Sequence, residues 1–239
     1  MTELGQFLRR DRSWHPAADT PAYRSTTFRA PRRALLSLPQ SVGELSGPVF
    51  GHGAIDPLDN DLIRNYATTG DAIGERILVH GTVMDENGRP VPGALIEIWQ
   101  ANAGGKYRHV NDKYMAALDP NFGGCGRVVS DAEGRYSFRT IRPGPYPFPN
   151  DGCAWRPAHI HLSIFGHAFV QRLVTQFYFE GDPLIARCAI VNTIKDPAAI
   201  ASLIAKLDMQ GMQAFDCLAY RFDIVLRGRH ATRFENRDS

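Results

Sequence analysis

Short segments in which hydrophobic and polar residues alternate recur along the chain from about residue 75 onward. Alternation with a period of two is typical of β-strands, because successive side chains of a strand point to opposite faces. Turn-forming residues separate these segments, and the Asn-Gly pair within residues 85–88 favours a hairpin between the strands on either side. The pattern predicts at least six strands, at residues 75–83, 94–100, 135–140, 158–165, 172–179 and 219–227.

One segment has helical spacing instead. Asp196 is suited to cap a helix, Pro197 to occupy its first turn, and residues 198–207 to continue it. Many short strands with frequent turns predict an all-β fold, an antiparallel β-sandwich core with long loops and one or two short helices. Residues 1–70 are rich in Pro, Gly, Asp and Asn and predict an extended N-terminal arm followed by loops, so residues 71–239 would form the sandwich of a single structural domain.

The composition of the 239 residues, with 44% hydrophobic and 22% charged, is that of a globular protein and excludes a disordered or low-complexity chain. No apolar run approaches the roughly 18 residues of a membrane-spanning helix, and the first residues lack the apolar core of a signal peptide. The cysteines show no CxxC spacing, which predicts reduced thiols and a cytoplasmic location. They are Cys125, Cys153, Cys188 and Cys217.

The net charge of +2 is too small to imply a nucleic-acid partner. Arginines are nevertheless concentrated in residues 1–33, together with Trp14 and Tyr23. A nucleic-acid arm could have this composition, but the prolines and aromatic residues favour an arm that lies on protein. Its guanidinium groups would then pair with carboxylates of a neighbouring subunit or attract an anionic substrate.

His159 and His161 are the strongest local indication of chemistry. Residues two apart on a strand point to the same face, with Cα atoms roughly 6.5–7 Å apart, and two imidazoles at that spacing can converge on one metal ion. An ordinary pair of histidines on a solvated strand face is the alternative.

Two tyrosines lie in loops that could present a phenolate to such a metal. Tyr146 lies in the stiff segment 142–149, which has four prolines in eight residues, and Tyr107 follows the Gly-Gly pair at 104–105. A surface tyrosine in a proline-rich recognition loop and a phosphate-binding loop are the respective alternatives. Two imidazoles with two phenolates favour ferric iron, because phenolate is a hard anionic donor, whereas zinc prefers Cys, His and carboxylate ligands.

Five segments, taken in order, resemble those of the intradiol ring-cleaving dioxygenases, and the resemblance runs from about Trp14 to Glu235. They are WQANAGGKYRH (99–109), LDPNFGGCGR (118–127), IRPGPYPFPN (141–150), WRPAHIHL (155–162) and TQFYFEGDP (175–183). The resemblance implies a β-sandwich with one mononuclear non-haem Fe(III) per chain. The iron ligands of the family carry over to Tyr107, Tyr146, His159 and His161.

The resemblance also implies roles around the iron. Tyr146 would be the ligand that the substrate displaces and, because the leaving phenolate is a base, also the general base. Arg156 would contact the substrate and stabilise the negative charge that develops during the reaction. Phe148 stands where close relatives commonly carry a tryptophan. The substrate pocket would be lined by Tyr23, Trp99, Phe148, Arg156 and Gln176.

The implied reaction is cleavage of protocatechuate (3,4-dihydroxybenzoate) by O2 to 3-carboxy-cis,cis-muconate, in aromatic catabolism through the β-ketoadipate pathway. Catechol or hydroxyquinol is the alternative substrate, but relatives with those substrates usually carry a helical N-terminal domain, and residues 1–70 show no helical periodicity. A non-catalytic sandwich module is disfavoured because all four ligands are present. The resemblance further implies a homologous α subunit, an αβ protomer and a higher symmetric oligomer, with no nucleic-acid or membrane partner.

Overall fold

The computed structural model describes residues 17, 19–30, 55–152, 154–166, 172–226 and 232. Trp14, most of the expected arm and Cys153 lie outside these ranges, as does Arg227 at the end of the last predicted strand. None of the helices in the described part of the chain is long and apolar enough to cross a bilayer.

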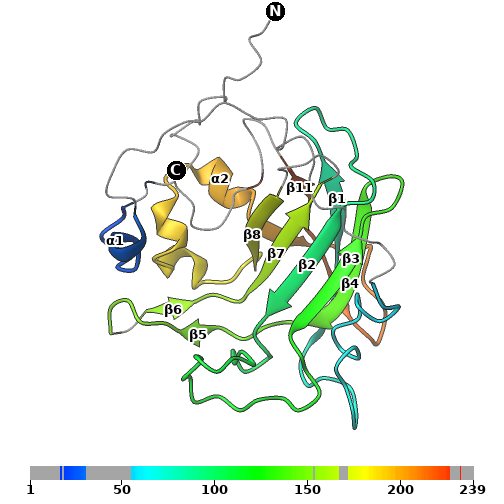
Figure 1. Ribbon diagram of the computed structural model, residues 1–239, viewed down its shortest axis with the longest axis horizontal. Coiled ribbons are helices and arrows are strands. Elements are labelled where there is room, and N and C mark those ends of the chain that lie inside the picture. Colours follow the sequence, from blue (N-terminus) through cyan, green and yellow to red (C-terminus); the bar gives the residue numbers. More distant parts are fainter. Residues whose placement is uncertain are drawn as a thin grey trace, which may run out of the picture.

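The fold is mostly β with a few short helices, as predicted (Figure 1). The helical segments are α1 (Thr26–Arg29), α2 (Pro197–Ala201) and the 3-10 turns η3 (Ile185–Arg187) and η4 (Val191–Thr193). The strands are β1 (Arg76–Met84), β2 (Leu95–Gln100), β3 (Cys125–Val129), β4 (Arg135–Ile141), β5 (Tyr146–Pro147), β6 (Trp155–Arg156), β7 (His159–Phe165), β8 (Arg172–Phe179), β9 (Ile204–Leu207), β10 (Leu218–Arg221) and β11 (Ile224–Val225).

Nine strands form one continuous sheet, and β5 and β6 form a separate two-stranded ladder. One half of the large sheet runs β4-β1-β10-β9, with β11 paired to the end of β1. The other half runs β8-β7-β2-β3, and the parallel pair β8–β9 joins the halves. Figure 1 shows β8, β7 and β2 side by side. The prediction of an antiparallel arrangement is wrong for three pairs, since β1–β10, β1–β11 and β8–β9 are parallel.

The core lies where the apolar faces of the two halves meet. Alternate residues of β1 and β2 are buried, and Ile77, Ile96 and Phe138 belong to one hydrophobic cluster. Phe177 of β8 stacks on Phe222, which follows β10, with ring centroids 4.8 Å apart. Strand β7 is buried on both faces, because one face packs into this core and the other faces the site described below.

The helix expected over residues 198–207 is much shorter in the structure. Its start is as predicted, because the Asp196 carboxylate accepts the Ala198 N–H at 2.8 Å and Pro197 lies in the first turn. The helix ends at Ala201, and β9 follows between β8 and β10. Helix propensity is a weak preference, and the backbone hydrogen bonds to two strands outweigh it here.

The expected hairpin around Asn87-Gly88 is also wrong in its pairing. The turn itself forms, with Gly88 at φ 74° and its N–H donating to the Asp85 carbonyl. Beyond a single bridge between Met84 and Pro90, however, the chain crosses to the other half of the sheet. Strand β1 pairs with β4, and β2 pairs with β3 and β7, because each half of the sheet must present one apolar face to the shared core.

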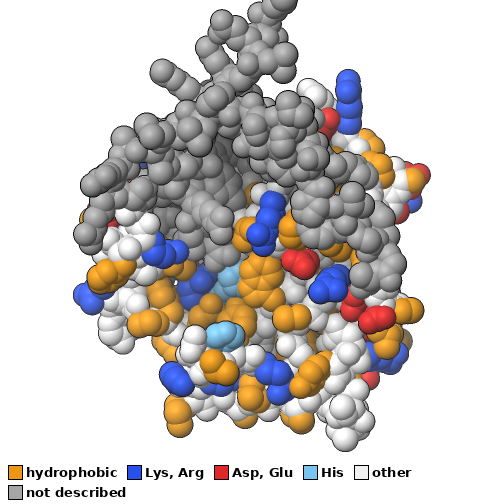
Figure 2. Space-filling view, in the orientation of Figure 1, with side chains coloured by type: hydrophobic (Ala, Val, Ile, Leu, Met, Phe, Trp, Pro, Cys, Tyr) orange, Lys and Arg blue, Asp and Glu red, His pale blue; other side chains and the backbone are white. Residues whose placement is uncertain are grey.

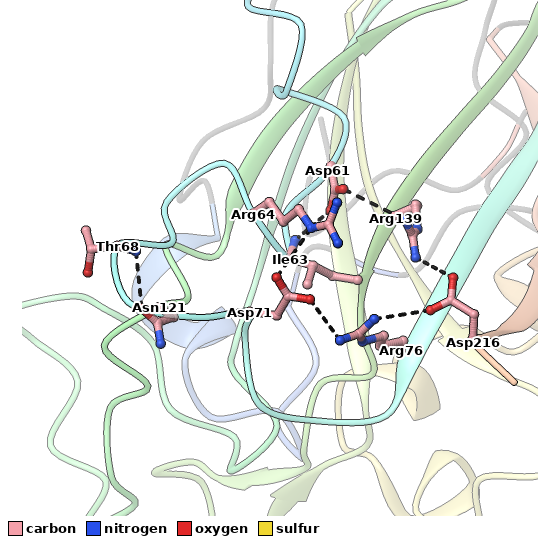
Figure 3. A network of polar contacts seen from close by, with 9 residues as sticks. All are labelled: Asp61, Ile63, Arg64, Thr68, Asp71, Arg76, Asn121, Arg139 and Asp216. Atoms are coloured by element: carbon pink, nitrogen blue, oxygen red, sulfur yellow. Dashed lines mark hydrogen bonds and ion pairs between the residues drawn. The ribbon is translucent and has the colours of Figure 1, made fainter.

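A chain of ion pairs ties the segment before β1 to the sheet (Figure 3). Arginines and aspartates alternate along it, so every charge lies beside opposite charges and the set is neutral. Each such exposed or half-exposed pair contributes little to the free energy of unfolding, about 0–1 kcal/mol. Together, however, the ion pairs connect four segments of the polypeptide. Its members are, in order, Arg64, Asp71, Arg76, Asp216, Arg139 and Asp61.

Candidate active site

Strand β7 places His159 and His161 on one face, with ring centroids 4.9 Å apart. The side chains are buried, at 2% and 7% exposure, which rules out the solvated strand face considered above. Trp99 is the cross-strand neighbour of His161 on β2, and its ring stacks on the imidazole at 5.0 Å with 2° between the planes. The neighbouring strand therefore fixes the orientation of the His161 ring.

Both predicted tyrosines lie beside these histidines. Tyr146, on β5, has its hydroxyl 3.2 Å from Nε2 of His159. The Tyr107 ring lies 5.5 Å from the Tyr146 ring and 6.4 Å from the His161 ring, centroid to centroid. Four side chains from three separate segments are thus brought together, two imidazoles and two phenols.

The loop that carries Tyr107 is built around the side chain of Asn102. Its amide oxygen accepts the N–H groups of Gly104 and Lys106, both at 2.9 Å, and its amide nitrogen donates to the Ala117 carbonyl at 2.9 Å. The N–H of Tyr107 itself donates to the Asp112 carboxylate at 2.8 Å. These bonds give Tyr107 a defined position although it lies in a loop.

Burial lowers the pKa of His159 well below its usual value, and the positive charge of Arg156 and the neighbouring His161 ring act in the same direction. The imidazole is therefore neutral near pH 7. Its Nδ1 lies 2.7 Å from the Pro157 carbonyl, and since a carbonyl can only accept, Nδ1 carries the proton. Nε2, which lies near Tyr146, is left with a lone pair that can bind a metal.

Arg156 is buried beside the four rings, with its guanidinium carbon 6.0 Å from the centroid of the Tyr146 ring. It donates to the side-chain oxygen of Gln176 and lies 3.5 Å from the Tyr178 hydroxyl. Gln176 is the cross-strand neighbour of His161 on β8. The positive charge of Arg156 is therefore held inside the site rather than at the surface.

Comparisons with known proteins show the family to which the chain belongs. The sequence pattern of the Dioxygenase family matches residues 45–228, and that of the protocatechuate 3,4-dioxygenase beta subunit N terminal matches residues 8–41. The chain belongs to the intradiol dioxygenase family. One similar member of the family is the protocatechuate 3,4-dioxygenase beta chain of Burkholderia cepacia, 49% identical over 226 residues that cover 94% of this chain and 96% of that one.

Other intradiol dioxygenases are more distant. The protocatechuate 3,4-dioxygenase alpha chain of Pseudomonas putida is 32% identical over 205 residues, which cover 82% of this chain and 96% of that one. Among solved structures, the 3-chlorocatechol 1,2-dioxygenase of Rhodococcus opacus aligns with a TM-score of 0.55 at 28% identity and covers 74% of this chain and 68% of that chain. The mostly β fold is thus the one seen in this family.

Two further predicted residues lie at the edge of the site. Tyr23 is buried, and its ring meets that of Phe148 edge-on at 6.3 Å. Asn150 holds the Tyr23 segment, because its side chain accepts the Arg24 N–H and donates to the Ala22 carbonyl. Tyr23 and Phe148 contact the same hydrophobic cluster as Tyr178, so the N-terminal segment reaches the neighbourhood of the four rings.

The sequence reasoning missed Tyr178. Its ring is almost completely buried, 6.0 Å from the His159 ring, and its hydroxyl faces Arg156. The signal was present, because Tyr178 lies two residues after Gln176 on a strand and must therefore share its face.

Proposed function

We propose that this intradiol dioxygenase cleaves protocatechuate with O2 to 3-carboxy-cis,cis-muconate, as the iron-bearing β subunit of an αβ enzyme in aromatic catabolism. The observation that carries the proposal is the gathering of Tyr107, Tyr146, His159 and His161 around one point. The identity to a protocatechuate 3,4-dioxygenase beta chain over nearly the full length of both chains supports the choice of substrate. The match at residues 8–41 supports it further, against catechol and hydroxyquinol.

The donor set fits one mononuclear ferric ion. Within the described residues, no three His, Cys, Asp or Glu side chains form a metal-binding group. The two phenols are therefore the side chains that could bind a metal ion together with the two imidazoles. Hard phenolate oxygens favour Fe(III), and the neutral His159 has its lone pair available at Nε2. When bound, ferric iron supplies withdrawal of electron density from a coordinated catechol, which makes the ring reactive toward O2.

The chain's own side chains prepare the substrate. Tyr146 would serve as an iron ligand and as the general base, since its phenolate oxygen can take a proton from the catechol. Arg156, held in place by Gln176, stabilises negative charge on the ring, and its burial makes this effect stronger than it would be in water. Tyr23, Trp99 and Phe148 line the rest of the substrate pocket together with Arg156 and Gln176.

The partner is a homologous α subunit. An α chain of a related enzyme is 32% identical to this chain, so the two kinds of subunit share a fold and can pair pseudo-symmetrically. In our proposal, residues 1–70 form an arm and loops, of which the arm at residues 1–40 lies across the partner. Residues 71–239 form the sandwich, and αβ protomers assemble into a closed symmetric oligomer.

The test is to purify the full chain with and without its α partner and to record visible spectra, iron content and muconate formation. We expect a red tyrosinate-to-iron absorption that changes on adding protocatechuate, and ring cleavage only when both chains are present. Larger spectral changes and faster turnover with catechol or hydroxyquinol would overturn the substrate assignment. A colourless protein that takes up no iron would overturn the catalytic proposal altogether.

A further inference from the structure

We propose that Gln100 is a positioning residue for the metal centre. It holds in place the backbone from which the segments with the four ligand side chains begin. The inference rests on the proposed function and concerns a residue with no contact to the reacting atoms. Gln100 is the last residue of β2 and is buried, at 2% exposure.

Both ends of the Gln100 amide are hydrogen-bonded inside the protein. Its nitrogen donates to the carbonyls of Ile141, at 2.9 Å, and Ala101, at 3.1 Å. Its oxygen accepts the Thr140 hydroxyl at 2.8 Å, and Thr140 is completely buried. A buried amide with these partners is costly to disturb, because each partner left unpaired keeps its full desolvation penalty.

Each group that Gln100 touches leads directly to a ligand. Ala101 starts the loop that ends at Tyr107, and Ile141 ends β4, from which the chain runs to Tyr146. In the β2–β7 ladder, Gln100 itself faces Ile160, the residue between the two histidines. The side chain of Gln100 therefore links the two segments that lead to the tyrosines, and its backbone lies beside the strand that carries the histidines.

The two tyrosine loops are also in direct contact beyond this point. The Gly144 N–H donates to the Asn102 carbonyl at 3.0 Å. A side-chain carbon at Gly144 would lie 2.3 Å from the Ala103 carbonyl oxygen, so the backbones meet with no space for a side chain. A shift of the backbone around Gln100, where both loops begin, would therefore move both tyrosines, because there is no free space between the loops to accommodate it.

The experiment compares Gln100→Leu with Ser130→Ala in the full chain co-expressed with its α partner. Ser130 is the matched control, because it is buried, accepts the Ala94 N–H at 2.8 Å and donates to the Val91 carbonyl at 2.7 Å, beyond the opposite end of β2. Both variants lose buried hydrogen bonds and should show a lowered Tm.

Only Gln100→Leu should also shift the visible absorption and lose iron to a chelator roughly 10–100-fold more readily, the usual range for residues that support metal ligands. In the metal-free protein, amide hydrogen exchange in residues 101–107 and 142–146 should rise in Gln100→Leu alone. If Gln100→Leu does not fold, Thr140→Val replaces it in the test, because it removes only the hydrogen bond from the Thr140 hydroxyl to Gln100. Thr140→Ser keeps a hydroxyl and should have the wild-type spectrum.

A lowered Tm with wild-type absorption, iron retention and exchange would show that Gln100 has a purely structural role and would overturn the proposal. Failure of the proposed function is distinguishable, because the wild-type protein itself would then bind no iron. The exchange comparison in metal-free protein would still decide the role of Gln100 in that case.

Discussion

Replacing Gly105 by alanine tests whether close packing of the two tyrosine loops stabilises the protein. Gly105 has φ 80°, and an added Cβ would lie 2.3 Å from the Pro145 carbonyl oxygen. The left-handed backbone costs an alanine about 1 kcal/mol, and overpacking against fixed backbone adds about 1–3 kcal/mol. We therefore expect Gly105→Ala to lower the free energy of unfolding by about 2–4 kcal/mol.

Gly88→Ala is the matched control for this prediction. Gly88 has φ 74°, nearly the same backbone conformation, but no atom lies within 4 Å of an added Cβ. It should lose only the conformational part, about 1 kcal/mol, or about 2–4 °C in Tm for a chain of this size. The assay is thermal unfolding of both variants beside the wild type, with the visible spectrum as a second measurement.

The difference between the two variants carries the test. A loss two- to fourfold larger in Gly105→Ala, with an altered tyrosinate absorption, is the expected result. Equal losses in Tm and an unchanged spectrum would refute the reasoning, since they would mean that the Tyr107 and Tyr146 loops yield to an added methyl group.

Three further predictions concern single side chains. Tyr146→Phe should retain most of its iron but turn over much more slowly, whereas His161→Ala should lose iron. Metal analysis and steady-state kinetics measure both effects. Wild-type turnover by Tyr146→Phe would exclude Tyr146 as the general base. Asp196→Ala removes the cap of α2 and should cost about 1 kcal/mol in denaturant unfolding without changing activity. Burial raises the pKa of Tyr136 well above its usual value, aided by the charge of Asp223. Below about pH 10, the pKa of tyrosine in the unfolded chain, Tyr136 is protonated in both the folded and the unfolded state. Above that pH only the unfolded chain loses this proton, so the free energy of unfolding should fall as the pH rises further. Tyr136→Phe should lessen that fall.

The sequence predicted local features well where a short pattern has one physical meaning. The alternation in β1 and β2 and the cap at Asp196 are local, and they form as predicted. The pairing of strands depends on contacts between distant segments, which explains why β9 and the parallel pairs were missed. Spacing alone brought His159 and His161 together. The loop composition made Tyr107 and Tyr146 candidate ligands but left alternatives open, and the family resemblance then selected them.

The short ladder between β5 and β6 bears on how the site can reset between turnovers. Tyr146 and Arg156 are direct cross-strand neighbours in it, and the Phe148 N–H closes the ladder on the Ala154 carbonyl. Because these bonds hold the backbone of Tyr146, we expect this side chain to move by rotation about its own bonds rather than by opening of the loop. Rotations of exposed side chains take picoseconds to nanoseconds, whereas loop motions take nanoseconds to microseconds. In the proposed reaction, the Tyr146 side chain would therefore move away and return while its backbone stays in place, so no loop would have to refold between one substrate and the next.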